Sequence, residues 1–367
     1  MRPLLTHTAA SRRHLRDSAS PVPELEPAQY RLRRHPKVAP VPRRGRFGLL
    51  AIAAATLVAT LAPPAVAAPR LRVIDLGALT SACCSQANAI NDRGDVVGGS
   101  SLSPHSHHAV LWRNGRMTDL GTLSDGRFST ATDINNHGDI VGVSDVGAAS
   151  THAVLWRGGQ AIDLGTLGGS YSHATAVNDA GEVVGYSTVS QWSNDLHAFL
   201  WRRGVMTDLG LLDNGSAGAA DINNRGQVVG YSSVDEMSSV PVRWERGAVQ
   251  SLTNLRGQAS AINDRGDVVG YYDGSAGSFL WSGGRIINLG RPAGASVMQA
   301  VGVNNRGEVV GYTDTSAFLW RRAGMTSLPS LAGGASGAMD VNNRGQVVGF
   351  SATDRQWSNS HAVLWTY

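Results

Sequence analysis

The sequence predicts an all-β fold: a seven-bladed β-propeller of four-stranded antiparallel blades, closed by its N-terminal strand. Three landmarks recur seven times after the first 70 residues: an Asn-Asx-x-Gly motif, a Val-Val-Gly or Ile-Val-Gly motif, and an apolar run ending in Trp. Successive motifs are 38 to 45 residues apart, and a period near 40 is typical of solenoids, propellers and arrays. The Asn-Asx-x-Gly motifs begin at Asn91, Asn135, Asn178, Asn223, Asn263, Asn304 and Asn342.

Each repeat has the pattern of four short strands. Asn178-Asp179-Ala180-Gly181 joins two of them, since Asn and Asp stabilise turns through their side chains and Gly accepts a left-handed conformation. The apolar run His197–Trp201 predicts the third strand, and Val205–Leu209 predicts the fourth after the turn at Arg203-Gly204. No segment shows a sustained helical pattern with caps.

The two ends of the repeat region distinguish a ring from an open solenoid. Residues 71–77 match the fourth strand of the other repeats, while the chain stops at Tyr367 just after a third strand. The N-terminal strand can therefore complete the last blade, as in closed propellers. A linear solenoid needs no such complementary ends.

Residue sizes agree with this arrangement. The first strand of each repeat is rich in Ala, as expected for the strand nearest the axis, and the repeated Trp is expected to fill the wider space between blades. The Gly inside every second strand predicts close approach by another group, for which a neighbouring aromatic ring is a candidate.

Residues 1–67 form a different region, a basic leader with a net charge of +8, whereas residues 68–367 carry −4. Arg43-Arg44-Gly45-Arg46, the apolar run Phe47–Ala62 and Ala65-Val66-Ala67 have the order of a secretory signal peptide. The basic pI belongs to this leader, so nucleic-acid binding loses its main support. We expect a secreted or periplasmic monomer of residues 68–367, with no stable membrane insertion after cleavage at Ala67; retention as an anchor is the alternative.

The only two cysteines, Cys83 and Cys84, are adjacent. They are expected to be two loop thiols; a vicinal disulfide or a bridge between chains is the alternative in an oxidising compartment.

The sequence predicts no metal site and no cofactor. The segment from Asp133 to Asp139 resembles the start of a calcium loop, but the other repeats place Ala, Gly or Arg at its ligand positions. Histidine recurs at the start of the third strand, where a hydrogen-bonding strand residue is the expected role. These residues belong to the contiguous blades seven, one, two and three of a closed ring: His361, His108, His152 and His197.

Two further tryptophans suggest a ligand site. Trp192 and Trp357 lie in near-identical loops, Gln-Trp-Ser-Asn, each just before one of these histidines. Exposed Trp can stack on a sugar face while amide side chains bind its hydroxyls; folding of the Trp over the blade edge is the alternative. The candidate ligand-binding residues are Trp192, Trp357, His197, His361, Asn194 and Asn359.

No catalytic residue is predicted. The chain has no nucleophile elbow, no His-Glu-x-x-His and no phosphate loop. Acidic residues sit mostly at repeated turn positions such as Asp92 and Asp179, or at strand ends such as Asp163. An active site in the axial channel stays open as an alternative, and it would require two or three acidic or His residues that converge there with no blade-equivalent structural role.

His197–Trp201, Met206–Gly210 and Gly165–Gly169 together resemble the bacterial HAF family of probable extracellular repeat proteins, and the likeness covers residues 71–367. The resemblance implies export and a repeat domain, but no catalytic residues. The leading hypothesis is a non-enzymatic module that binds a glycan or another envelope or extracellular component. The alternatives are an extracellular hydrolase or lyase, and a protein-interaction scaffold with a broad apolar patch.

Overall fold

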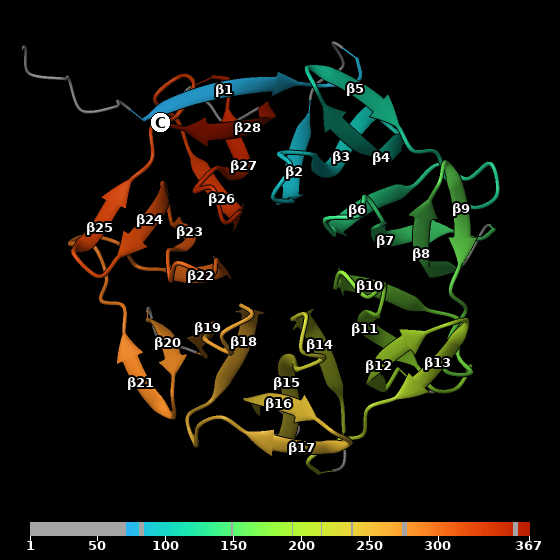
Figure 1. Ribbon diagram of the computed structural model, residues 1–367. Coiled ribbons are helices and arrows are strands. Elements are labelled where there is room, and N and C mark those ends of the chain that lie inside the picture. The colour runs from blue at the N-terminus through green and yellow to red at the C-terminus, as the bar shows by residue number, and fades with distance from the viewer. Residues whose placement is uncertain are drawn as a thin grey trace, which may run out of the picture. The chain divides into compact units, whose positions relative to one another are not determined.

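The computed structural model describes residues 71–80, 84–147, 150–192, 194–213, 215–235, 238–273, 277–354 and 359–367. These residues form 28 strands in seven four-stranded antiparallel sheets, arranged around an axis as the blades of a propeller (Figure 1). The predicted fold class is confirmed. The described part of the chain contains no helix, and hence none that could cross a membrane.

The blades follow one another along the chain, and in each the first strand is innermost. Blade one is β2 (Ser85–Ile90), β3 (Val96–Ser103), β4 (Ser106–Arg113) and β5 (Arg116–Asp119). Blade two is β6 (Ser129–Ile134), β7 (Ile140–Asp145), β8 (Thr151–Arg157) and β9 (Gln160–Asp163). Blade three is β10 (Ser172–Val177), β11 (Val183–Thr188), β12 (Leu196–Arg202) and β13 (Val205–Asp208). Blade four is β14 (Ala217–Ile222), β15 (Val228–Asp235), β16 (Ser238–Glu245) and β17 (Ala248–Ser251).

The remaining blades have the same order. Blade five is β18 (Gly257–Ile262), β19 (Val268–Tyr272), β20 (Ser278–Ser282) and β21 (Arg285–Asn288). Blade six is β22 (Met298–Val303), β23 (Val309–Thr313), β24 (Ala317–Arg321) and β25 (Gly324–Ser327). Blade seven is β26 (Ser336–Val341), β27 (Val347–Ala352), β28 (Ser360–Thr366) and β1 (Arg72–Gly77).

Ring closure occurs in blade seven, where β1 pairs antiparallel with β28. Arg72 lies opposite Thr366 and Val73 opposite Trp365. The N-terminal strand therefore completes the last sheet, as predicted, and blade seven has a fourth, outermost strand like the other blades (Figure 1). All 28 strands, including the closing pair, belong to one compact unit, Val66–Tyr367.

The inner strands are small-residue strands with a bulge. Each pairs with its neighbour in register up to a buried Ala, and then shifts by one residue. The Gly of the second strand faces this point. A Cβ on Gly185 would lie 1.9 Å from the carbonyl oxygen of His173, and all seven equivalents meet the same backbone oxygen. The prediction of an aromatic neighbour was thus wrong for most blades: the Gly is required by the inner strand's own backbone.

Tryptophan fills the seams between blades, as predicted. Trp112 packs against Val348 and Ala362 of blade seven, and its indole N–H donates to the carbonyl of Leu76 at 3.0 Å. Trp244 occupies the same position between blades three and four. Each seam has its own cluster of buried apolar side chains, so the core is divided into seven parts.

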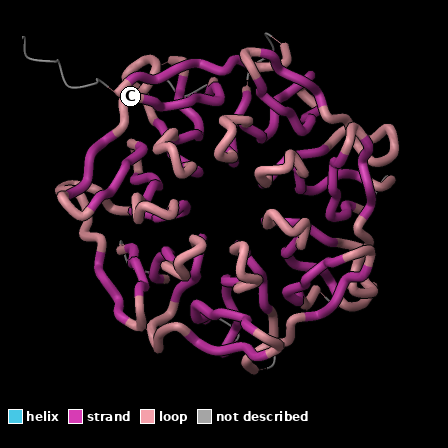
Figure 2. Tube along the Cα trace, in the orientation of Figure 1, coloured by secondary structure: helices cyan, strands magenta, loops and turns pink. Residues whose placement is uncertain are grey.

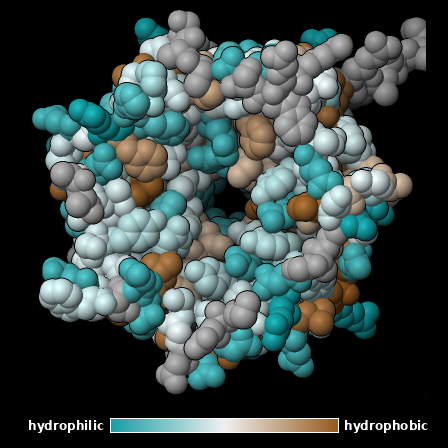
Figure 3. Space-filling view, turned by 180° about the vertical axis from the view of Figure 1, so that it is seen from behind, coloured by the Kyte–Doolittle hydropathy of each residue, from teal (hydrophilic) through white to brown (hydrophobic). Residues whose placement is uncertain are grey.

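The propeller has two chemically distinct faces. The turn face holds the Asn-Asx-x-Gly turns and the short turns between the third and fourth strands; the loop face holds the other connections (Figures 1 and 2). Seen from the loop face, the axial opening is a central hole, and the described residues around it form no broad apolar patch (Figure 3). The leader (residues 1–67), Cys83, Trp357 and their predicted roles lie outside the described residues; Cys84 is partly buried and has no disulfide partner among the residues that the structure describes.

Candidate functional site

The loop between β11 and β12 presents Trp192 on the loop face. This side chain is 96% exposed, the highest value among the large apolar residues that the structure describes. Its backbone N–H donates to the Ser190 hydroxyl at 3.3 Å, and Asn194 beside it is also exposed. The alternative in which Trp192 folds over the blade edge is therefore wrong, and the ring is available for stacking.

The equivalent loop of blade seven lies between β27 and β28. Trp357 falls outside the described residues, while Asn359 is exposed and its carbonyl accepts from the Thr353 N–H at 3.0 Å. Two whole blades separate this loop from Trp192 in the ring. The two candidate loops thus belong to separate places on the loop face.

The four histidines make one repeated contact. Nδ1 of His197 lies 2.6 Å from an Asp208 carboxylate oxygen, linking the third strand to the end of the fourth. The same carboxylate accepts from the Gly210 N–H at 2.7 Å. The three equivalent pairs have distances of 2.9 Å: His108–Asp119, His152–Asp163 and His361–Asp75. Each pair joins two strands at the rim, which agrees with the predicted hydrogen-bonding role.

Histidine and aspartate occur together or not at all at these two positions. Blades four to six have Val240 with Ser251, Gly277 with Asn288, and Ser316 with Ser327. The four pairs therefore occupy one continuous arc of the rim, in blades seven, one, two and three. In blade three the arc includes Trp192, because the β11–β12 hairpin carries both Trp192 and His197.

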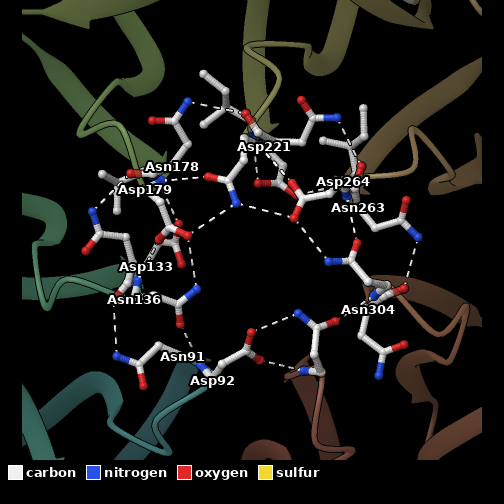
Figure 4. A pocket seen from close by; sticks show the side chains of 18 of the residues that line it. Asn91, Asp92, Asp133, Asn136, Asn178, Asp179, Asp221, Asn263, Asp264 and Asn304 are labelled. Carbon is white, nitrogen blue, oxygen red and sulfur yellow. Dashed lines mark hydrogen bonds between the residues drawn. The ribbon is translucent and has the colours of Figure 1, made fainter.

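A ring of asparagines surrounds the axial channel on the turn face (Figure 4). The Asn223 side-chain N–H donates to the carbonyl of Asn263 in the next blade at 3.0 Å, and its Oδ1 accepts from Arg225 and Gln227 backbone N–H groups. Every blade repeats the contact between blades, and Asn342 returns to Asn91 at 3.0 Å. These side chains are buried, so the first Asn of each motif holds the ring together.

The second residue of each motif forms another closed ring (Figure 4). The backbone N–H of Asn136 donates to the Asp179 carboxylate at 2.8 Å, and that of Asp179 donates to Asn224 at 2.8 Å. The series continues through Asp264, Asn305 and Asn343 and ends at Asp92. Side-chain bonds such as Asn136 Nδ2 to Asp179 Oδ2 at 3.1 Å pair amide donors with carboxylate acceptors.

Three more aspartates line the channel just below this ring. Asp221 accepts from the Ile222 N–H at 2.7 Å and, in the next blade, from the Ile262 N–H at 2.8 Å. Asp133 and Asp340 make the same two contacts. Each carboxylate thus satisfies two N–H groups at the bulges of neighbouring inner strands. Three carboxylates serve six blades, and blade six, with Gly302, is left over.

These carboxyls are held in their protonated form more strongly than usual. Desolvation in the channel is the main cause, and repulsion from other channel carboxylates adds to it. The pKa of Asp133 rises to about 7, that of Asp221 to about 8 and that of Asp340 to about 6. A carboxyl that titrates near neutral pH has the property required of a general acid or base.

The acidic residues of the two channel layers come from different blades. Blades with Asp at the inner position have Asn in the ring above, as in Asp221 with Asn224, while blades with Ala at the inner position have Asp, as in Ala176 with Asp179. The cavity of about 180 Å³ between them is lined by six carboxyl groups and no Lys or Arg. Spreading the charge over two layers lowers the repulsion between neighbours.

The described residues contain no group of three or more His, Cys, Asp or Glu side chains placed to hold a metal ion. Asp133, the first position of the calcium-like segment, uses its carboxylate on Ile134 and Val177 instead. Sequence reasoning missed the three inner aspartates as a set. Reading the two channel positions together across the seven repeats would have revealed their alternation.

No protein-family model and no curated protein matches this sequence. Several solved structures are similar to this chain at low sequence identity. TolB from Acinetobacter baumannii is 13% identical with a TM-score of 0.41, covering 73% of this chain and 78% of its own. A gluconolactonase from Xanthomonas campestris is 12% identical with a TM-score of 0.41, covering 80% and 89%. An acylaminoacyl peptidase from Pyrococcus horikoshii is 12% identical with a TM-score of 0.39, covering 70% and 54%.

Proposed function

We propose that the repeat domain is a secreted, non-enzymatic module that binds a glycan through the Trp192 loop. The observation that carries the proposal is the exposure of Trp192 at the tip of a hairpin, beside Asn194. An almost fully exposed indole contributes little to the stability of the fold, since it buries almost no apolar surface. It is a good contribution to binding, because a sugar ring can stack on it.

The rim beneath the loop supplies polar groups. His197 is held by Asp208 through Nδ1, which orients the ring and leaves Nε2 for a ligand hydroxyl. His361 and Asn359 have the corresponding place in blade seven, and the Gln-Trp-Ser-Asn sequence before His361 assigns Trp357, which lies outside the described residues, to this second proposed subsite. Two separate subsites favour a polymeric glycan, because a chain can reach both and gain from their combined affinity.

The test is a binding screen of residues 66–367 against glycans and cell-envelope fractions, with tryptophan fluorescence as the readout. We expect a saturable change that is weakened in Trp192→Ala and in Trp357→Ala, lost in the double variant, and largely restored by Trp192→Phe. Val205→Ala is the matched control, since Val205 is a 62% exposed apolar side chain on β13 at the turn face. Equal binding by wild type and the double variant would reject these subsites.

A second candidate function is a hydrolase or lyase with its site in the axial channel. The raised pKa values of Asp133, Asp221 and Asp340 support it, because these carboxyls converge on one cavity and occur in only three blades. Their bonds to backbone N–H groups support a structural role instead. Polysaccharide cleavage that is lost in Asp221→Asn but retained in Trp192→Ala would favour the enzyme over the binding module.

A protein-interaction scaffold has less support. The exposed large apolar side chains are dispersed over several blades and both faces, as Val205, Leu255 and Ile286 illustrate. Export and membership of the HAF family remain part of the proposal, resting on the leader and on the repeated phrases of the sequence. Detection of the processed chain outside the cytoplasm would test export.

A further inference from the structure

Arginine is concentrated on one face of the propeller. Sixteen of the nineteen arginines that the structure describes belong to the turn face; Arg127, Arg256 and Arg291 are the three on the loop face. The described carboxylates divide equally between the two faces, and those of the loop face, including the four of the His–Asp pairs, greatly outnumber its three arginines. The net charge of −4 in residues 68–367 thus hides a basic face and an acidic face.

Several turn-face arginines are neutralised locally. Arg113 forms a bidentate contact with Asp95 at 2.9 and 3.0 Å, and Arg157 does the same with Asp139 at 2.7 and 2.8 Å. Eight others are exposed and form no ion pair within the described residues: Arg72, Arg116, Arg203, Arg225, Arg246, Arg285, Arg322 and Arg344. These eight residues are the basic rim, and they come from six of the seven blades.

In two blades a neutral residue replaces the acid that would quench the charge. Asn263 donates to Asp267 at 3.0 Å, and Asp267 also pairs with Arg265. At the equivalent place in blade four, Asn223 donates to Gln227 at 2.9 Å. The amide preserves the hydrogen bond of the ring and removes the negative charge, which leaves Arg225 without an ion-pair partner among the described residues. Blade seven repeats this with Gln346 and Arg344.

Two arginines of the basic rim have a backbone conformation that is unfavourable for a long side chain. Arg203 and Arg246 have φ values of 52° and 54°, the left-handed region that long side chains rarely adopt. The equivalent turn positions hold Asn114, Gly158 and Gly283, which are suited to it. A residue kept in an unfavourable conformation points to a function for its side chain.

We propose that the basic rim docks the turn face on a surface of anionic lipid headgroups. The charges encircle a face rather than follow a groove, so a planar anionic surface can contact all of them at once, whereas a linear polymer would contact a few. Each arginine near such a surface contributes a similar increment of affinity. Docking in this orientation directs the loop face, with Trp192, away from the bilayer.

The test uses sedimentation of residues 66–367, which form the self-contained unit, with vesicles of phosphatidylglycerol and phosphatidylcholine or of phosphatidylcholine alone. Omitting the basic leader removes a competing source of attraction. We expect binding to the anionic vesicles only, and release as salt rises from 0.05 to 0.5 M (about 14 Å and 4 Å of screening length).

The decisive variant is Arg203→Asn/Arg246→Asn, because Asn accepts the left-handed conformation and the fold is retained. Affinity for anionic vesicles should fall about five-fold for each arginine removed, while the melting temperature stays equal or rises. Arg127→Asn/Arg256→Asn removes the same charge from the loop face and should leave vesicle binding unchanged.

Three results would overturn the proposal. They are binding to neutral vesicles of equal strength, an equal loss in the loop-face control, and rim-dependent binding to duplex DNA without binding to vesicles. The last would assign the rim to a nucleic acid instead of a bilayer. Because glycan binding is tested by Trp192 variants, either proposal can fail without the other.

Discussion

The inner rings and the outer rim of this propeller derive from the same seven repeats but obey different constraints. Every blade supplies the first Asn of its turn, and each Asn bonds to the next blade in a closed circuit. At the rim, only four blades have the His–Asp pair, and one described loop presents an exposed Trp. Positions that join blades must repeat, whereas positions at the rim can differ, so the differences are where function is expected.

The largest expected effect comes from breaking the inner ring. Asn223→Ala removes the bond to Asn263 and leaves the backbone N–H groups of Arg225 and Gln227 without their acceptor. We expect a loss of about 3 kcal/mol or more in the free energy of unfolding, since four hydrogen bonds of the Asn223 side chain are lost, including the one to Gln227 Oε1. Urea unfolding followed by tryptophan fluorescence measures it. Asn194→Ala is the control, and a similar loss in both would contradict the distinction between ring and rim.

The next effect concerns pH and the three inner aspartates. Their folded-state pKa values of about 7, 8 and 6 exceed the ordinary value of 3.8. The folded state therefore binds more protons than the unfolded state between these values, and stability falls as pH rises through the folded pKa. We expect the domain to be more stable at pH 5 than at pH 8.5 by several kcal/mol, since each pKa unit corresponds to about 1.4 kcal/mol.

Unfolding curves at the two pH values measure this difference. Asp221→Asn should flatten the dependence on pH, whatever its effect on absolute stability, because the group with the highest pKa is removed. Stability that increases from pH 5 to pH 8.5 would contradict the assignment of raised pKa values.

A smaller effect is expected at the rim. His152 and Asp163 are joined at 2.9 Å but are partly exposed to solvent. Replacing His152 by Gln, or Asp163 by Asn, should cost about 0.2 to 1 kcal/mol, the range of solvent-accessible ion pairs. A double-mutant cycle gives the coupling energy directly, and a coupling above about 2 kcal/mol would show that the rim is structural in the same sense as the inner ring.

The smallest effect on stability is expected for Trp192→Ala. The side chain is almost completely exposed, so its removal should change the free energy of unfolding by no more than about 0.5 kcal/mol. The same variant should weaken glycan binding. If the stability falls by several kcal/mol, Trp192 packs against the domain and its proposed role in binding is wrong.

Much of the fold could be predicted because the seven repeats can be aligned with one another. The seven Asn-Asx-x-Gly turns, the Ala-rich inner strands and the complementary ends all predicted a closed ring, and β1 pairing with β28 confirmed it. The contact of the second-strand Gly was not predictable, because a bulge in the partner strand moves the backbone of His173 toward Gly185. A register shift of one residue leaves no clear pattern in a six-residue strand.

The candidate site was predicted in part. The exposure of Trp192 and the contact of His197 with Asp208 concern residues on one hairpin and the adjacent strand, which local patterns can place. The channel was not predicted, since Asp133, Asp221 and Asp340 are 88 or more residues apart and meet only around the axis. These three carboxylates form the inner layer because each accepts from backbone N–H groups of its own blade and of the next.

The sequence by itself determined the repeat, the number of blades, the turn chemistry and the way the ring closes, because each of these depends on contacts within one repeat or between its ends. Tertiary structure alone decided which charges share a face. Antiparallel strands send alternate connections to opposite sides of the disc, so arginines and aspartates that are interspersed along the chain separate into a basic and an acidic face. A net charge sums over both faces, and only their arrangement in space shows the field that a partner meets.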